Sequence, residues 1–227
     1  GSAARLRIYS SSMEEQLSWS LTTTDGTPLR LAFSPDGRRL AVAAVTVSGG
    51  QMVTNFYIVT LAQGDPVLVG SGSGAAQWLS WPSAQSLLAL CDSRAVLYNA
   101  SGGEKAAYDF TGQTLRDISV DASGNAALLL ASGKLCQAVM LDRELNVEGT
   151  AQVQAANRIV RAGQSFYLLT DSGVECLSTD GASQWQQSLS ARPQGLLADR
   201  KQLLVFCGNT VQVLTPPEAE TSASGNP

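Results

Sequence analysis

The chain has 227 residues, with 15 Lys and Arg against 19 Asp and Glu, a formal net charge of −4 and no histidine. The lack of histidine excludes a Ser-His-Asp triad, a Cys-His nucleophile pair and any metal site built on imidazole. The mild acidity gives no support for nucleic-acid binding, which needs clustered Lys and Arg, so we expect no nucleic-acid partner.

The chain begins with two strand-like segments, 5–9 and 16–21, which look like the last two strands of a four-stranded unit. Beyond them, short apolar runs recur along the whole sequence. The runs start at Leu40, Leu87, Ala127, Phe166 and Leu203, at spacings of 47, 40, 39 and 37 residues. Such a period of about 40 residues indicates a repeat architecture.

One repeat shows the pattern within each unit. It contains strand-like segments at 157–160, 166–170, 174–178 and 184–189, joined by turns rich in Gly, Asp and Ser. Four-stranded units of this length are typical of a β-propeller, because one blade cannot cover both of its own apolar faces. We therefore predict an all-β propeller of about five blades over residues 5–215. The predicted units are a partial blade at 5–21 and blades at 29–70, 76–110, 114–150, 156–189 and 192–215.

Two long segments, 40–64 and 66–91, carry no charge. Ser48–Gln51 interrupts the first and Gly70–Gly74 the second, so we predict no transmembrane helix and no signal peptide. The Gly70–Gly74 tract is interpreted as a flexible link between blades. It is not a phosphate-binding loop, because no Lys-Ser/Thr pair and no helix follow it.

The cysteines, the turn aspartates and three of the tryptophans are assigned structural roles. The four cysteines, at 91, 136, 176 and 207, contain no CxxC pair, and they are predicted to be reduced, buried thiols. Asp36, Asp121 and Asp180 lie in turns without EF-hand spacing, so we expect them to bond to their own turns rather than to calcium. Trp78, Trp81 and Trp185 are expected to pack between blades. We expect no catalytic residue, no cofactor and no metal site.

Three arginines form the one candidate binding site. Arg30, Arg116 and Arg158 fall near the starts of predicted first strands, which line the axial channel of a propeller. If they converge, they can clamp a carboxylate or a phosphate. The alternatives are that they are solvated rim charges or partners for Asp117.

The two ends of the predicted array leave its closure open. The segment 216–227 is a polar, flexible tail that follows a strand stopped by two prolines. Either the N-terminal strands complete the last blade and close the ring, or the sequence is part of a larger propeller whose first blade is cut; we favour the second. A cut blade exposes an open edge, which invites self-association.

Two motifs resemble known propeller repeats. Ser34–Gly37, with the sequence SPDG, resembles the hairpin of WD40-like and YVTN-like propellers, and Leu177–Trp185 resembles quinoprotein-like repeats. The order of these features over 5–214 is similar to an uncharacterised bacterial family of propeller ectodomains. That resemblance implies an extracytoplasmic location and membrane attachment through a helix outside this sequence.

The expected function is a non-catalytic scaffold that binds a protein, glycan or ligand partner. The alternative is a degenerate quinoprotein-like enzyme or a small-ligand sensor that uses the central channel.

Overall fold

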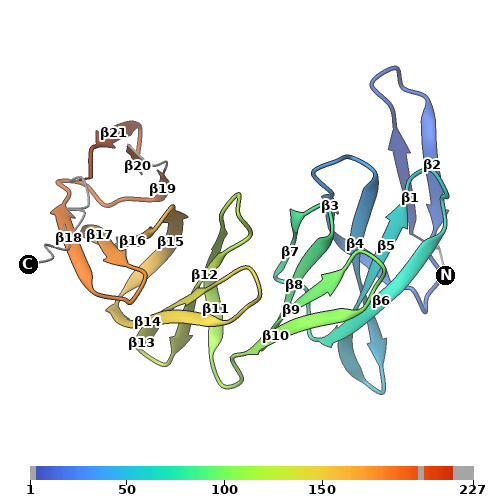
Figure 1. Ribbon diagram of the computed structural model, residues 1–227, viewed down its shortest axis with the longest axis horizontal. Helices are drawn as coiled ribbons and strands as arrows, with labels where there is room; N and C mark the ends of the chain where they lie inside the picture. The colour runs from blue at the N-terminus through green and yellow to red at the C-terminus, as the bar shows by residue number, and fades with distance from the viewer. Residues whose placement is uncertain (1–3, 199–201, 217–227) are drawn as a thin grey trace, which may run out of the picture.

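The computed structural model describes residues 4–198 and 202–216. Within them, all regular structure is β: twenty-one strands form antiparallel sheets, and no helix is present. The described part of the chain therefore contains no helix that could cross a lipid bilayer. Figure 1 shows the sheets following one another along a curved array, with the N-terminal and C-terminal sheets on opposite sides of the view.

The sheets follow the chain order, and each is a meander of consecutive strands. The N-terminal sheet contains β1 (Arg5–Tyr9) and β2 (Glu15–Ser20). The four complete sheets contain β3 (Thr27–Phe33), β4 (Arg39–Ser48), β5 (Gln51–Thr60) and β6 (Pro66–Ser73); β7 (Trp78–Ser83), β8 (Ser86–Cys91), β9 (Arg94–Asn99) and β10 (Glu104–Asp109); β11 (Thr114–Val120), β12 (Ala126–Ser132), β13 (Leu135–Leu141) and β14 (Val147–Gln154); and β15 (Ala156–Ala162), β16 (Ser165–Thr170), β17 (Gly173–Ser178) and β18 (Ser183–Ser188). The C-terminal sheet contains β19 (Gly195–Ala198), β20 (Leu203–Cys207) and β21 (Thr210–Leu214).

The apolar core is divided among the sheet interfaces. Five separate clusters of buried side chains exist, and each joins one sheet to the next. The second strands β8, β12 and β16 are buried on both faces, which explains their nearly continuous apolar sequences. This arrangement confirms the predicted all-β propeller fold.

Tryptophans bridge consecutive sheets, as predicted. Trp81 lies in the cluster between the first two complete sheets, and its indole Nε1 donates to the carbonyl oxygen of Ala32 on β3 at 3.0 Å. Trp78 and Trp185 pack at the edges of two further clusters.

The prediction of a flexible link at Gly70–Gly74 is wrong, because residues 70–73 belong to β6. A β-carbon at Gly70 would overlap the hydroxyl of Tyr98 on the next sheet. One at Gly72 would lie 2.8 Å from the Sγ of Cys91. Glycine is used here because the following sheet approaches this strand closely, not because the chain must bend.

The N-terminal hairpin does not complete the last sheet. In the described residues, β1 pairs only with β2, and β21 pairs only with β20. The hairpin instead packs on β4 and β5, where the rings of Trp19 and Tyr57 meet edge to face at 5.1 Å. Of the predicted tail 216–227, residues 217–227 lie outside the described part.

Candidate functional site

The inner strands of the array line the candidate site. The first strand of each sheet lies at one sheet edge, and β3 contacts β7, β11 contacts β15, and β15 contacts β19. A recess of about 480 Å³ opens where β3, β7 and β11 approach one another. The recess is therefore built from three different sheets.

Arg30 reaches this recess from β3. Its Nε donates to the carbonyl oxygen of Ala76, 2.9 Å away, just before β7 begins. This bond uses only one of the five guanidinium N–H groups, and the side chain stays exposed. Arg30 is thus held by a hydrogen bond to the segment that leads into β7 and lines the recess with an exposed side chain.

Arg116 lines the same recess from β11 and is exposed to solvent. The pairing of β11 with β12 shifts between Leu115 and Asp117, so that Arg116 is the extra residue of a β-bulge. Bulges redirect side chains, which explains why a charged group in the middle of this strand is free to point away from the sheet interfaces.

Arg158 does not itself line the recess, but it is bonded to Asp117, which does. It lies on β15, and its Nη1 donates to Oδ1 of Asp117 at 3.2 Å. The other oxygen of Asp117 accepts the backbone N–H of Ile159 at 2.9 Å. Of the interpretations that the sequence left open, partnership with Asp117 is the one that the structure shows for Arg158, while Arg30 and Arg116 share the recess.

Bulges near the starts of inner strands are a feature that sequence analysis did not identify. Similar register shifts occur between Pro28 and Arg30 on β3 and between Ala156 and Arg158 on β15. Relative to these shifts, Arg30 corresponds to Asp117 and Arg158 rather than to Arg116. The three arginines are therefore not equivalent positions of the repeat.

Apolar groups, one amide and the carboxylate of Asp117 complete the recess. Leu29, Trp78 and Leu115 line it together with Gln77, whose Oε1 is buried and has no hydrogen-bond partner among the described residues. The chemistry therefore combines guanidinium donors with an aromatic and aliphatic surface and with one carboxylate, Asp117, whose charge is paired with Arg158. Such a surface suits an organic anion better than a bare ion, because it can contact the carbon skeleton as well as the charge.

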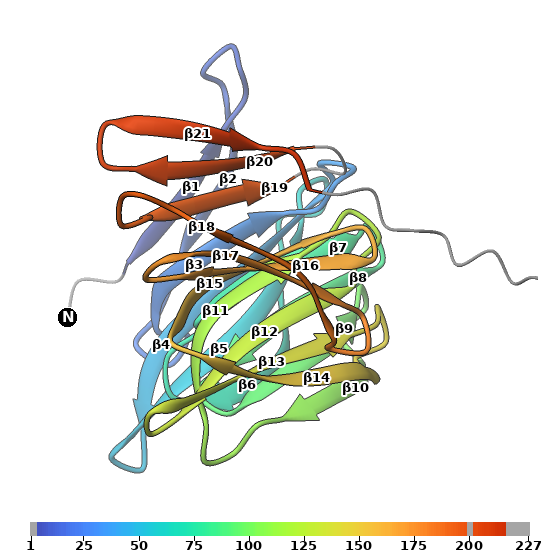
Figure 2. The ribbon, with the colours of Figure 1, turned by 90° about the vertical axis from the view of Figure 1, so that its left-hand side faces the viewer.

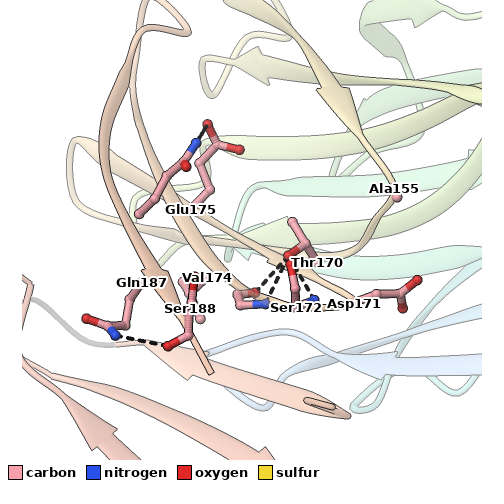
Figure 3. Close-up of a pocket in the computed structure, with 10 residues that line it drawn as sticks. Ala155, Thr170, Asp171, Ser172, Val174, Glu175, Gln187 and Ser188 are labelled. Atoms are coloured by element: carbon pink, nitrogen blue, oxygen red, sulfur yellow. Dashed lines mark hydrogen bonds between the residues drawn. The ribbon is translucent and has the colours of Figure 1, made fainter. Parts of the chain in front are cut away.

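A second recess, of about 380 Å³, lies on the sheet β15–β18 (Figure 3). Its polar groups bond mainly to one another: Thr170 Oγ1 accepts the N–H of Gly173 at 3.1 Å, and Glu175 accepts Gln186 at 3.0 Å. Asp171 accepts hydrogen bonds from Arg192 and Asn157, which hold its pKa below the usual value. Figure 3 shows the carboxylates of Asp171 and Glu175 pointing to separate places, so this recess offers no convergent site.

The turn aspartates form hydrogen bonds within their own turns, as predicted. Asp36 accepts the hydroxyl of Ser34 at 2.6 Å and the N–H of Arg38, and these bonds lower its pKa. Asp121 accepts the backbone N–H groups of Ser123 and Asn125, and Asp180 accepts the hydroxyl of Ser178. The described residues contain no group of three Cys, Asp or Glu side chains placed to hold a metal ion. All four cysteines are free and buried, as predicted.

Comparison with known proteins identifies the fold but no family. No protein-family model and no curated protein match the chain. Among solved structures it is similar to a eukaryotic initiation factor, with a TM-score of 0.68 and 11% identity over 94% of this chain and 60% of the other. An oligogalacturonate lyase in complex with manganese matches with a TM-score of 0.62 and 12% identity, covering 94% of this chain and 72% of the lyase. The Pan2 WD40 domain of Neurospora crassa matches with 0.57 and 9%, covering 90% and 67%. These similarities show a WD40-like β-propeller fold.

Proposed function

We propose that this chain is a non-catalytic binding scaffold whose inner-strand recess binds an organic anion. The observation that carries the proposal is that Arg30 and Arg116, from two different sheets, line one recess together with Trp78 and Leu115. A propeller holds such a site rigidly, since each inner strand is fixed by its own sheet and by the neighbouring one.

The proposal also covers the location of the scaffold and the class of its partner. The resemblance to bacterial propeller ectodomains supports an extracytoplasmic location and a membrane tether outside this sequence. A low content of charged residues, 15%, and an exposed polar outer strand such as β18 support a protein or glycan partner at the outer surface.

The same recess also supports the alternative of a small-ligand sensor that uses the central channel. A scaffold and a sensor both bind the anion, but a sensor must change its structure or its partner affinity when it does so. A degenerate quinoprotein-like enzyme requires in addition converging carboxylates. The recess has the carboxylate of Asp117, which is already paired with Arg158.

Anion titration tests the proposal. Succinate, citrate and phosphate are added at constant ionic strength while thermal stability and tryptophan fluorescence are followed. We expect a saturable rise in melting temperature and a fluorescence change from Trp78.

Matched variants distinguish the recess from general charge effects. Arg116→Gln removes one charge from the recess, and Lys134→Gln removes one from an exposed turn between β12 and β13. The first should abolish the response and the second should preserve it. No response to any of the anions, or equal responses in both variants, would refute the assignment.

A further inference from the structure

Two polar recesses adjoin one another at the turns of the first three complete sheets. One, of about 400 Å³, lies between the first and second of these sheets, and the other, of about 320 Å³, lies between the second and third. Gln85 and Lys105 line both recesses, which therefore form one groove. Each of the three sheets packs on a neighbour on both sides, so the groove belongs to the interior of the array and not to an uncovered end.

The order of the strands explains why residues of three sheets meet in this groove. In a four-stranded meander, the first and third turns lie at the same end of the sheet. Arg39 directly follows the first turn of its sheet, Gln85 lies in the first turn of the next sheet, and Lys105 follows the third turn of that sheet. Arg143 lies in the third turn of the sheet after that. Figure 2 shows the strands running across the view, so that the turns gather on two opposite sides. The inner-strand recess, at the starts of β3, β7 and β11, lies toward the other end of the sheets.

Three cations line the groove, and none of them forms an ion pair among the described residues. Arg39 is held by its Nη1, which donates to the carbonyl oxygen of Ala84 at 2.8 Å, and no described residue uses its remaining side-chain N–H groups. The exposed side chains of Lys105 and Arg143 form no hydrogen bond with a described residue. Glu144 is the single carboxylate that lines the groove. In a chain with a net charge of −4, the groove is therefore a local region of positive charge.

The turn carboxylates closest in sequence are bonded within their own turns. Asp142 accepts the backbone N–H groups of Glu144 and Asn146, both at 2.8 Å, and the Asn146 side-chain amide at 2.9 Å. Asp121 is bonded within its turn and also lies 3.2 Å from the Nε of Arg161. Neither aspartate lines the groove, so both leave its cations available to a ligand.

The uncharged lining indicates which class of anionic ligand fits. It consists mainly of hydroxyl and amide side chains, and it includes no aromatic residue; the polar members are Ser83, Gln85, Ser86, Asn99, Ser101 and Ser123. Protein interfaces depend on buried aromatic and aliphatic anchors, and single-stranded nucleic acids stack on aromatic rings. An acidic polysaccharide instead offers carboxylates to the cations and hydroxyls to the amide and serine side chains.

We propose that this basic groove, defined by Arg39, Gln85, Lys105 and Arg143, binds an acidic polysaccharide. Its cations come from three consecutive sheets, so they suit the repeated charges of an extended polymer better than one compact anion. The inference rests on the proposed role as a binding scaffold, for which it names the partner class, but the groove shares no residue with the inner-strand recess. Polysaccharide binding and small-anion binding therefore succeed or fail independently.

Titration of fluorescently labelled alginate, a polymer of uronic acids, with the whole chain at low salt tests the groove. We expect a saturable rise in fluorescence anisotropy with alginate and none with labelled neutral dextran. Raising the salt concentration should weaken the binding, because it depends on contacts between charges. Glu144→Gln removes the one carboxylate of the groove and should tighten the binding by about twofold or more.

A matched pair of double variants separates the groove from the overall charge of the chain. Lys105→Gln with Arg143→Gln removes two cations of the groove, and Arg5→Gln with Lys134→Gln removes two exposed cations elsewhere, so both proteins have the same net charge. The first should raise the dissociation constant for alginate by at least about 10-fold and the second by less than about twofold. Circular dichroism checks that both proteins fold.

Three results would overturn the proposal. The first is a lack of alginate binding by the parent chain, and the second is an equal loss in the two double variants. The third is binding of poly-glutamate as tight as that of alginate and equally sensitive to the groove substitutions, because an acidic protein segment would then be the better assignment.

Discussion

Replacing Arg161 with methionine should destabilise the fold more than any change of a surface charge. Arg161 lies on β15 with a side chain only 2% exposed, at the interface with the preceding sheet. Its Nε lies 3.2 Å from Asp121 and one Nη lies 3.0 Å from Glu148. The other Nη donates to the carbonyl oxygen of Leu141 at 3.1 Å, and the guanidinium lies 4.9 Å from the ring centre of Phe166.

The expected loss of stability is estimated from the contacts of Arg161 that methionine cannot make. A hydrogen bond from a charged donor to the Leu141 carbonyl contributes about 2 kcal/mol, and the contact with the Phe166 ring about 1 kcal/mol. The two carboxylates are 14% and 34% exposed, so water can solvate them in part once the guanidinium is gone. We therefore expect a loss of about 3 kcal/mol, which for a chain of this size lowers the melting temperature by about 6–12 °C.

Removing the acids instead should cost more. Asp121→Asn combined with Glu148→Gln leaves a guanidinium in a 2% exposed position without a counter-charge, which costs about 3–5 kcal/mol. Adding Arg161→Met to that pair should recover part of the loss, because the buried charge is then removed.

Urea unfolding followed by tryptophan fluorescence measures these differences as shifts in midpoint at unchanged slope. Arg192→Met serves as the control, because the Arg192–Asp171 pair is largely exposed and should contribute nothing measurable. An Arg161→Met protein as stable as the parent, or a triple variant no better than the double, would show that the guanidinium is not a supporting part of this interface.

Three further outcomes are expected. Burial raises the pKa of Cys91 to about 11 and also raises that of Cys176, so Ellman's reagent should react slowly with the native chain and titrate four thiols after denaturation; rapid reaction of native protein would contradict the burial. Gly72→Ala should destabilise the chain through contact with the Sγ of Cys91, and Cys91→Ala should relieve part of that loss in a double-mutant cycle, whereas additive losses would exclude the contact. The backbone N–H and hydroxyl of Thr22 lower the pKa of Asp25, so its contribution is complete above the unfolded pKa of about 3.9 and declines as the pH falls through the lower folded value. Asp25→Asn should flatten acid unfolding in that range, and an unchanged profile would refute the assignment.

The repeat could be predicted from the sequence because strands that are buried on both faces have a simple pattern of continuous apolar residues. Second strands such as β8 and β12 lie between two sheets, so they need continuous apolar residues. The turns between strands need Gly, Asp or Ser, and these divide the runs at regular intervals. The outermost strands of the sheets were harder to predict. Gly70–Ser73, for example, belongs to the strand β6, although its composition is typical of a linker.

The candidate site was only partly readable. Charged residues near the starts of inner strands identified Arg30 and Arg116, which do line one recess. Sequence analysis gave partnership with Asp117 as one alternative for the three arginines. It could not decide that Arg158 takes this role, because the contact joins two sheets and two residues 41 positions apart. It also placed the end of one strand at residue 160, whereas β15 continues to Ala162 and carries Arg161 into the interface.

The presence or absence of a neighbouring sheet explains why the array contains both a buried charge and an exposed apolar face. Inside the array, a sheet face meets a neighbour that can supply ion partners as well as apolar contacts, so Arg161 is buried without being isolated. At the C-terminal end, the face of Val211 and Val213 has the residues of an internal interface but no neighbour in the described chain. Whether a charge can be buried in this fold is therefore decided by the facing sheet, and Arg161 is buried because that sheet supplies two carboxylates and the carbonyl oxygen of Leu141.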